Sequence, residues 1–229
     1  MKIANKPGQL QLRQSWHPAP LPAALQRLAQ FPVRRLLALM PLLLAACASA
    51  PAEHFYTLQA PATPPASEQL WPQPLVLANL TLPDLVDKPQ LVLRKNPQQV
   101  QIMEQRRWAE PLKGALAQAL AANLRAQGMQ VALTSDHLAH DSAWQLWVDV
   151  LQFESSPGKE ALLEVQWQVR SASGARLYSG KGLWREAVAS SDIDALIAAH
   201  QRALQQCAQE MGRSLQRLPA PTSPSASQP

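Results

Sequence analysis

Cysteine is scarce in this chain of 229 residues, which contains only Cys47 and Cys207. The sequence has no Cys-x-x-Cys pair and no cluster of histidine and cysteine, so it offers no basis for a metal site. If Cys47 is covalently modified, Cys207 has no partner within the chain for a disulfide. The fold must then be stabilised by its hydrophobic core. We expect Cys207, which lies on the apolar stripe of a predicted helix, to be buried.

Acidic residues are absent from the first 46 positions, which carry six Lys and Arg residues and a charge of +6. The whole chain has 21 Lys and Arg against 16 Asp and Glu, so residues 47–229 have 15 against 16, a net charge of −1. A basic chain often indicates a nucleic-acid partner. Because the positive excess lies in the leading segment alone, we expect no nucleic-acid binding by the remainder.

Charge is also absent from residues 36–46, directly after Arg34-Arg35. A basic segment followed by 11 uncharged residues is typical of a secretory signal, and it is shorter than the roughly 20 apolar residues needed to span a bilayer. The segment ends in Leu44-Ala45-Ala46-Cys47, which resembles the bacterial lipobox. In that motif the small residues fit the signal peptidase, and the cysteine thiol receives a diacylglycerol.

We therefore predict a diacylglycerol and an N-acyl chain on Cys47 and no other cofactor. Ala48 follows, where an Asp would favour retention in the inner membrane, so we expect the outer membrane. One alternative is a general secretory signal with a chance cysteine. The long basic segment also leaves open a translation start near residue 33.

The predicted organisation is a signal peptide at 1–46, a lipidated tether at 47–53, one domain at 54–218 and a tail at 219–229. The tail is rich in Pro, Ser and Ala, a composition that favours disorder. Period-two and period-three-to-four patterns predict the order β-β-β-β-α-β-β-β-β-α. We expect an α+β fold with a mostly antiparallel sheet and two long helices packed on one face. Gly180 and Gly182 in the last strand indicate a bulge or a close backbone approach.

Three segments of the predicted domain resemble the PqiC family of ABC-type transport auxiliary lipoproteins. The similarity covers about residues 47–215, and its segments are His54-Phe55-Tyr56-Thr57-Leu58, Leu82-Pro83-Asp84-Leu85-Val86-Asp87-Lys88-Pro89-Gln90-Leu91-Val92 and Arg107-Trp108-Ala109-Glu110-Pro111-Leu112. Lys88 stands where the family usually has Arg, which keeps the charge but loses bidentate hydrogen bonding.

The resemblance implies an outer-membrane lipoprotein that faces the periplasm and performs no catalysis. It implies work with an inner-membrane protein carrying MCE domains, which form a tunnel for lipids, and a place at the receiving or docking end of that bridge. It also makes a homo-oligomer plausible, although nothing in the periodicity demands one. The alternative is a structural or assembly lipoprotein of another envelope complex.

Four charged residues in or beside these segments form the first candidate site. Asp87, Arg94, Arg107 and Glu110 either dock a partner or cap and orient the start of the first helix, since an acid in the first helical turn suits the helix dipole. Trp147 is the second candidate, because it faces away from Trp144 on its strand, and we expect a partner surface or a lipid-contacting patch there.

Enzyme signatures are absent from the sequence. It contains no Gly-x-Ser-x-Gly and no glycine-rich phosphate loop, so it is not the ATPase of a transporter. His137 and His140 lie near Asp136 and Asp141, but this spacing in a predicted loop is nonspecific. A periplasmic hydrolase would need a nucleophile and a base held together, and the sequence shows no such pair. We therefore predict no catalytic and no metal-binding residues.

Overall fold

The computed structural model describes residues 52–59, 71–134, 136 and 142–218. The predicted signal peptide, the lipobox residues with Cys47, most of the tether and the tail lie outside these residues. The described part contains the predicted order of eight strands and two helices. The α+β class is confirmed.

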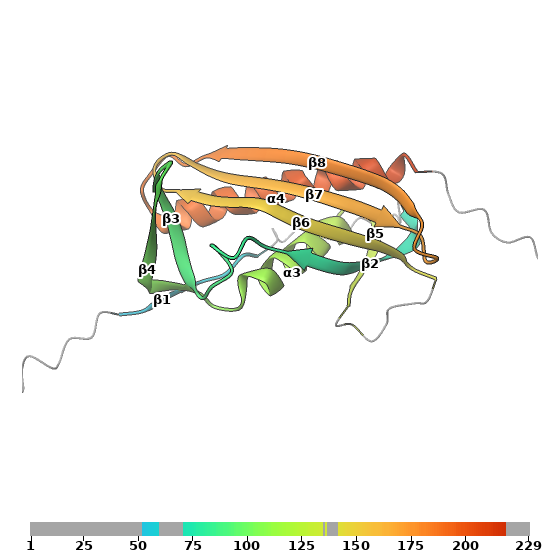
Figure 1. The fold of residues 1–229 in the computed structure, drawn as a ribbon, viewed down its shortest axis with the longest axis horizontal. Helices are drawn as coiled ribbons and strands as arrows, with labels where there is room; N and C mark the ends of the chain where they lie inside the picture. Colours follow the sequence, from blue (N-terminus) through green and yellow to red (C-terminus); the bar gives the residue numbers. More distant parts are fainter. Residues whose placement is uncertain (1–51, 60–70, 135, 137–141, 219–229) are drawn as a thin grey trace, which may run out of the picture. The chain divides into compact units, whose positions relative to one another are not determined.

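A five-stranded sheet forms the larger layer (Figure 1). Its strand order is β5-β2-β6-β7-β8, with β6 in the centre. β6 and β7 form a long antiparallel hairpin, and β8 extends it, whereas β2 runs parallel to both β5 and β6. The bounds are β2 Trp71–Thr81, β5 Met129–Leu133, β6 Trp144–Ser156, β7 Glu160–Arg170 and β8 Arg176–Ala187.

A second, three-stranded sheet lies at one end of the larger one, with the order β1-β4-β3 (Figure 1). β3 and β4 form an antiparallel hairpin, and the short β1 pairs in parallel with the end of β4. The bounds are β1 His54–Tyr56, β3 Gln90–Asn96 and β4 Gln99–Trp108. The strands thus form two mixed sheets, although the longest pairings are antiparallel.

Both helices cover the same face of the five-stranded sheet, as predicted (Figure 1). α3 (Leu112–Arg125) packs on β2 and β5, and α4 (Ile193–Gln216) packs on β7, β8 and α3. The buried stripe of α4 includes Cys207, which is 1% exposed. Burying one large apolar side chain contributes about 1.5–3 kcal/mol, so this stripe is a main source of stability.

The two glycines of β8 lie where indole rings closely approach the backbone of the strand. Gly180 is opposite Trp167, and a Cβ atom at Gly180 would overlap the Trp167 ring. A Cβ atom at Gly182 would overlap the ring of Trp184 in the same way. The close approach predicted from these glycines is therefore confirmed, and Trp167 is almost fully buried beneath α4.

Candidate functional site

The turn between β2 and β3 carries Asp87. Two backbone hydrogen bonds close this turn, from the N–H groups of Val86 and Asp87 to the carbonyl of Pro83, at 3.0 and 3.2 Å. The buried Val86 fixes the turn to the core, while the Asp87 side chain is exposed. Asp87 is therefore presented to solvent by a rigid turn.

Arg94 links the two sheets. Its guanidinium donates to both carboxylate oxygens of Glu154 on β6, at 2.7 and 3.2 Å. Bidentate pairs of this kind fix geometry as well as charge. Both side chains are half-buried, so the pair orients the small sheet against the large one more than it stabilises the fold.

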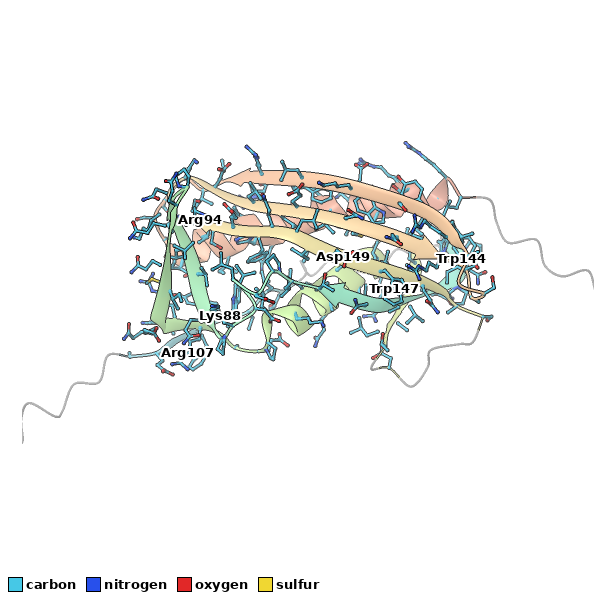
Figure 2. The ribbon with its side chains drawn as sticks, viewed as in Figure 1. Lys88, Arg94, Arg107, Trp144, Trp147 and Asp149 are labelled. Carbon is cyan, nitrogen blue, oxygen red and sulfur yellow. The ribbon has the colours of Figure 1, made fainter. Side chains whose placement is uncertain are left out.

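Arg107 lies at the opposite end of β3 from Arg94 (Figure 2). It forms an ion pair with Glu53 at 3.4 Å and donates to the carbonyl of Glu104 at 3.2 Å. Arg94 and Arg107 therefore lie at opposite ends of the small sheet. Whether either place docks a partner stays a prediction.

Glu110 does not lie in the first turn of α3, contrary to the prediction. The helix begins at Leu112 with Pro111 at its N-cap, and its first turn contains no acid. The cause is local, because the residue before a proline is driven out of the helical region by the proline ring. Glu110 therefore remains in the bend that precedes the helix and cannot serve as a first-turn acid.

Trp147 lies on the face of the large sheet opposite the helices, as predicted (Figure 2). Its ring is half-buried, and its indole N–H donates to Gln145 at 3.2 Å. The Arg170 guanidinium carbon lies 5.0 Å from the ring centroid, a cation–π arrangement worth about 0.5–1 kcal/mol. Trp144, on the other side of the strand, is buried.

A cavity of about 120 Å³ lies between the two sheets. Most of its walls are apolar, and the Arg94–Glu154 pair lines one part of them. Leu85 and Leu151, which are 41% and 39% exposed, also line this intersheet cavity. An engineered apolar cavity of about 150 Å³ takes up benzene. The intersheet cavity therefore has room for one apolar side chain of a partner.

Sequence reasoning missed a buried pair between Ser155 on β6 and His200 on α4. Ser155 Oγ and His200 Nε2 lie 2.8 Å apart, and the Phe153 ring stacks on the imidazole at 4.0 Å between centroids. Burial lowers the pKa of His200 to about 3. Its Nδ1 has no hydrogen-bond partner among the described residues. A buried imidazole with such a low pKa is a poor general base, so the pair is better suited to the core than to catalysis.

The described residues contain no group of three or more His, Cys, Asp or Glu side chains that could hold a metal ion. No helix in this part of the chain has the length and apolar composition to cross a bilayer.

A sequence model of the ABC-type transport auxiliary lipoprotein component matches residues 56–212. No curated protein matches the chain. Among solved structures, an uncharacterised protein is 18% identical over 72% of this chain and 99% of its own, with a TM-score of 0.61. A protein from Xanthomonas campestris is 24% identical over 71% of this chain and 95% of its own, with a TM-score of 0.57.

The two structural neighbours support the fold alone. Sequence identity of 18% and 24% carries no information about function. The family match spans well over half of the chain and includes two of the three segments in full. The chain therefore belongs to the family of ABC-type transport auxiliary lipoprotein components, as its resemblance to PqiC lipoproteins implied.

Proposed function

We propose that the protein is held in the outer membrane by acyl chains on Cys47, faces the periplasm, and serves as an accessory or docking subunit of an MCE-type intermembrane lipid transport system. The single observation that carries this proposal is the family match over residues 56–212, which begins nine residues after Cys47. The family is one of transport auxiliary lipoproteins and not a family of enzymes.

The intersheet cavity supports this docking role. The intersheet cavity is open to an apolar side chain, and the Arg94–Glu154 pair beside it supplies polar contacts. The energetic centres of protein interfaces are typically well-packed, desolvated pockets, and arginine is enriched among their residues. We therefore place the contact with the MCE-domain partner at this cavity.

Co-purification tests the proposed partner. The tagged lipoprotein, extracted with mild detergent, is expected to recover an inner-membrane protein carrying MCE domains. Repeated recovery of a different envelope complex in its place would favour a structural or assembly lipoprotein. Recovery of the lipoprotein alone as a ring or other homo-oligomer would reveal self-association without this partner.

Replacing Leu151 by Gln is expected to weaken partner binding about tenfold, because a polar amide would then enter the apolar cavity wall. Leu177→Gln is the matched control, since Leu177 is 37% exposed against 39% for Leu151 and lies on β8. Binding is measured by titration of the purified partner, and folding by thermal unfolding. Equal binding by the two variants would remove the cavity from the interface.

Replacing Cys47 by Ser is expected to abolish acylation, because the thiol is the group that receives the diacylglycerol. Incorporation of radiolabelled palmitate and the mass of the precursor report the result. Cys207→Ser is the control and should keep the label, since Cys207 is buried in the core. Normal palmitate incorporation by the Cys47→Ser variant would refute the anchor, and a purely inner-membrane location of the wild-type chain would refute the outer-membrane assignment.

A further inference from the structure

Phe55 is exposed although it belongs to a strand. It is 60% exposed, the highest value among the large hydrophobic side chains of the described residues. Its neighbour Tyr56 packs against the core, and side chains alternate along a strand, so Phe55 must point outward. The described residues thus leave most of this ring uncovered.

The position of Phe55 in the chain limits what that contact can be. Ala52, the first described residue, follows Cys47 by five positions and therefore lies within about 18 Å of it even when the tether is fully extended. Phe55 itself lies at most about 29 Å from Cys47 along the chain. β1 is the first element of the domain, so an acyl chain on Cys47 would keep this strand beside the bilayer.

A short tether also makes a weak contact effective. Linking two sites by a short flexible segment raises their effective concentration to roughly the millimolar range. A single aromatic ring would not recruit a free protein to a membrane, but it suffices to orient a domain that is already anchored. The leaflet that holds the anchor is therefore in reach of Phe55 at all times.

The charges around Phe55 suit a phosphate-bearing surface. In the parallel pairing, His54 is opposite Arg106 and Phe55 is opposite Arg107. Side chains alternate along β4, so Arg107 shares the face of Phe55, whereas Arg106 lies on the opposite face with the buried Trp108. A guanidinium binds phosphate oxygens well. The pair of Arg107 with Glu53, at 3.4 Å and partly exposed, is weak, so the Arg107 guanidinium is available to lipid headgroups.

We propose that β1 is a membrane-contact surface, in which the Phe55 ring enters the boundary between headgroups and acyl chains and Arg107 contacts headgroup phosphates. This inference rests on the acylation of Cys47 in the proposed function and concerns the same leaflet. The contact fixes the orientation of the domain, so that the small sheet faces the membrane that holds the anchor.

Spin labelling of the full lipidated protein tests the contact. The Phe55→Cys variant is labelled with a nitroxide and reconstituted into vesicles of phosphatidylethanolamine and phosphatidylglycerol. Leu183→Cys is the matched control, because Leu183 is 46% exposed and lies on β8 in the other sheet. Native Cys207 does not react, since it is only 1% exposed. Collisions with oxygen, which enters lipid, and with a water-soluble nickel complex are then compared.

At position 55 the ratio of oxygen to nickel collisions is expected to exceed that at position 183 by about threefold or more, as for a side chain at the depth of an interfacial helix. Equal ratios would overturn the proposal. Shielding of position 55 from both reagents would also overturn it, because a protein surface would then cover Phe55. If the protein does not float with the vesicles, both the anchor and this contact are overturned. If the protein floats but the nitroxide at position 55 is exposed to water, the contact alone is overturned.

A second variant keeps an aromatic ring at the site. Phe55→Trp is expected to add tryptophan fluorescence to that of the wild-type protein. Lipids brominated in their acyl chains should quench this added fluorescence, so the variant is quenched more than the wild-type protein. Leu183→Trp serves as the control and should add fluorescence that these lipids do not quench. Equal quenching of the two added signals would contradict the membrane contact even if labelling at position 55 disturbed the strand.

Discussion

Acidification from pH 7 to pH 3 is expected to cost the domain about 4 kcal/mol of folding free energy through His200 alone, and about half of that at pH 5. Burial lowers the pKa of His200 from its usual 6.5 to about 3. The unfolded chain therefore binds a proton on this residue below pH 6.5, while the folded domain does not until the pH approaches 3. The stability that depends on a neutral His200 is complete above pH 6.5 and is lost as the pH falls toward 3.

The His200→Gln variant isolates this effect from the titration of carboxylates. Its amide can still bond to Ser155, and it has no proton to gain. Urea unfolding at a series of pH values is expected to give a smaller loss of stability for the variant than for the wild-type chain, with the difference growing between pH 6.5 and pH 3. Parallel stability curves for the two proteins would show that His200 is not held neutral by burial.

Substituting Gly180 by Ala is expected to destabilise the domain by about 1–3 kcal/mol, the usual cost of overpacking a well-filled core. The added methyl group would overlap the Trp167 ring, which cannot retreat because it is 2% exposed. A loss of this size would lower the melting temperature by roughly 2–4 °C per kcal/mol in a domain of this length. Gly180→Val should cost more.

Gly114→Ala provides the matched control, because an added Cβ atom there meets nothing within 4 Å. Gly114 lies inside α3, where alanine is favoured over glycine by about 0.5–1 kcal/mol. The melting temperature and the urea midpoint should therefore fall for Gly180→Ala and rise for Gly114→Ala. A Gly180→Ala variant as stable as the wild-type chain would mean that β8 can move away from Trp167 without loss.

Periodicity predicted the elements well because it reports which face of a strand or helix is buried. The alternation through Trp144 and Leu146 assigned the faces of β6, including the outward direction of Trp147. Alternation does not say which strand lies beside which, so the division into two sheets and the parallel pairing of β2 with β6 were not predictable from it.

Two side-chain pairs of the structure could not be predicted from the sequence, for the same reason. Arg94 and Glu154 are 60 residues apart in the chain, and Ser155 and His200 are 45 apart, so only the packing of strands and helices brings them together. The one available signal for the second pair was a histidine on the apolar stripe of α4. The position of Glu110, in contrast, could have been predicted from Pro111, because the restriction before a proline is local.

The neighbours of β2 set the order in which the domain can form during synthesis. Leu75 pairs with Trp144, and Thr81 with Asp149, so β2 cannot be fixed against β6 until about seventy further residues have emerged. The covering helix α4 is the last element, which leaves the core face of β7 and β8 bare until the chain is nearly complete. Contacts this distant slow folding, so the domain is expected to complete its core later than a domain built from local contacts.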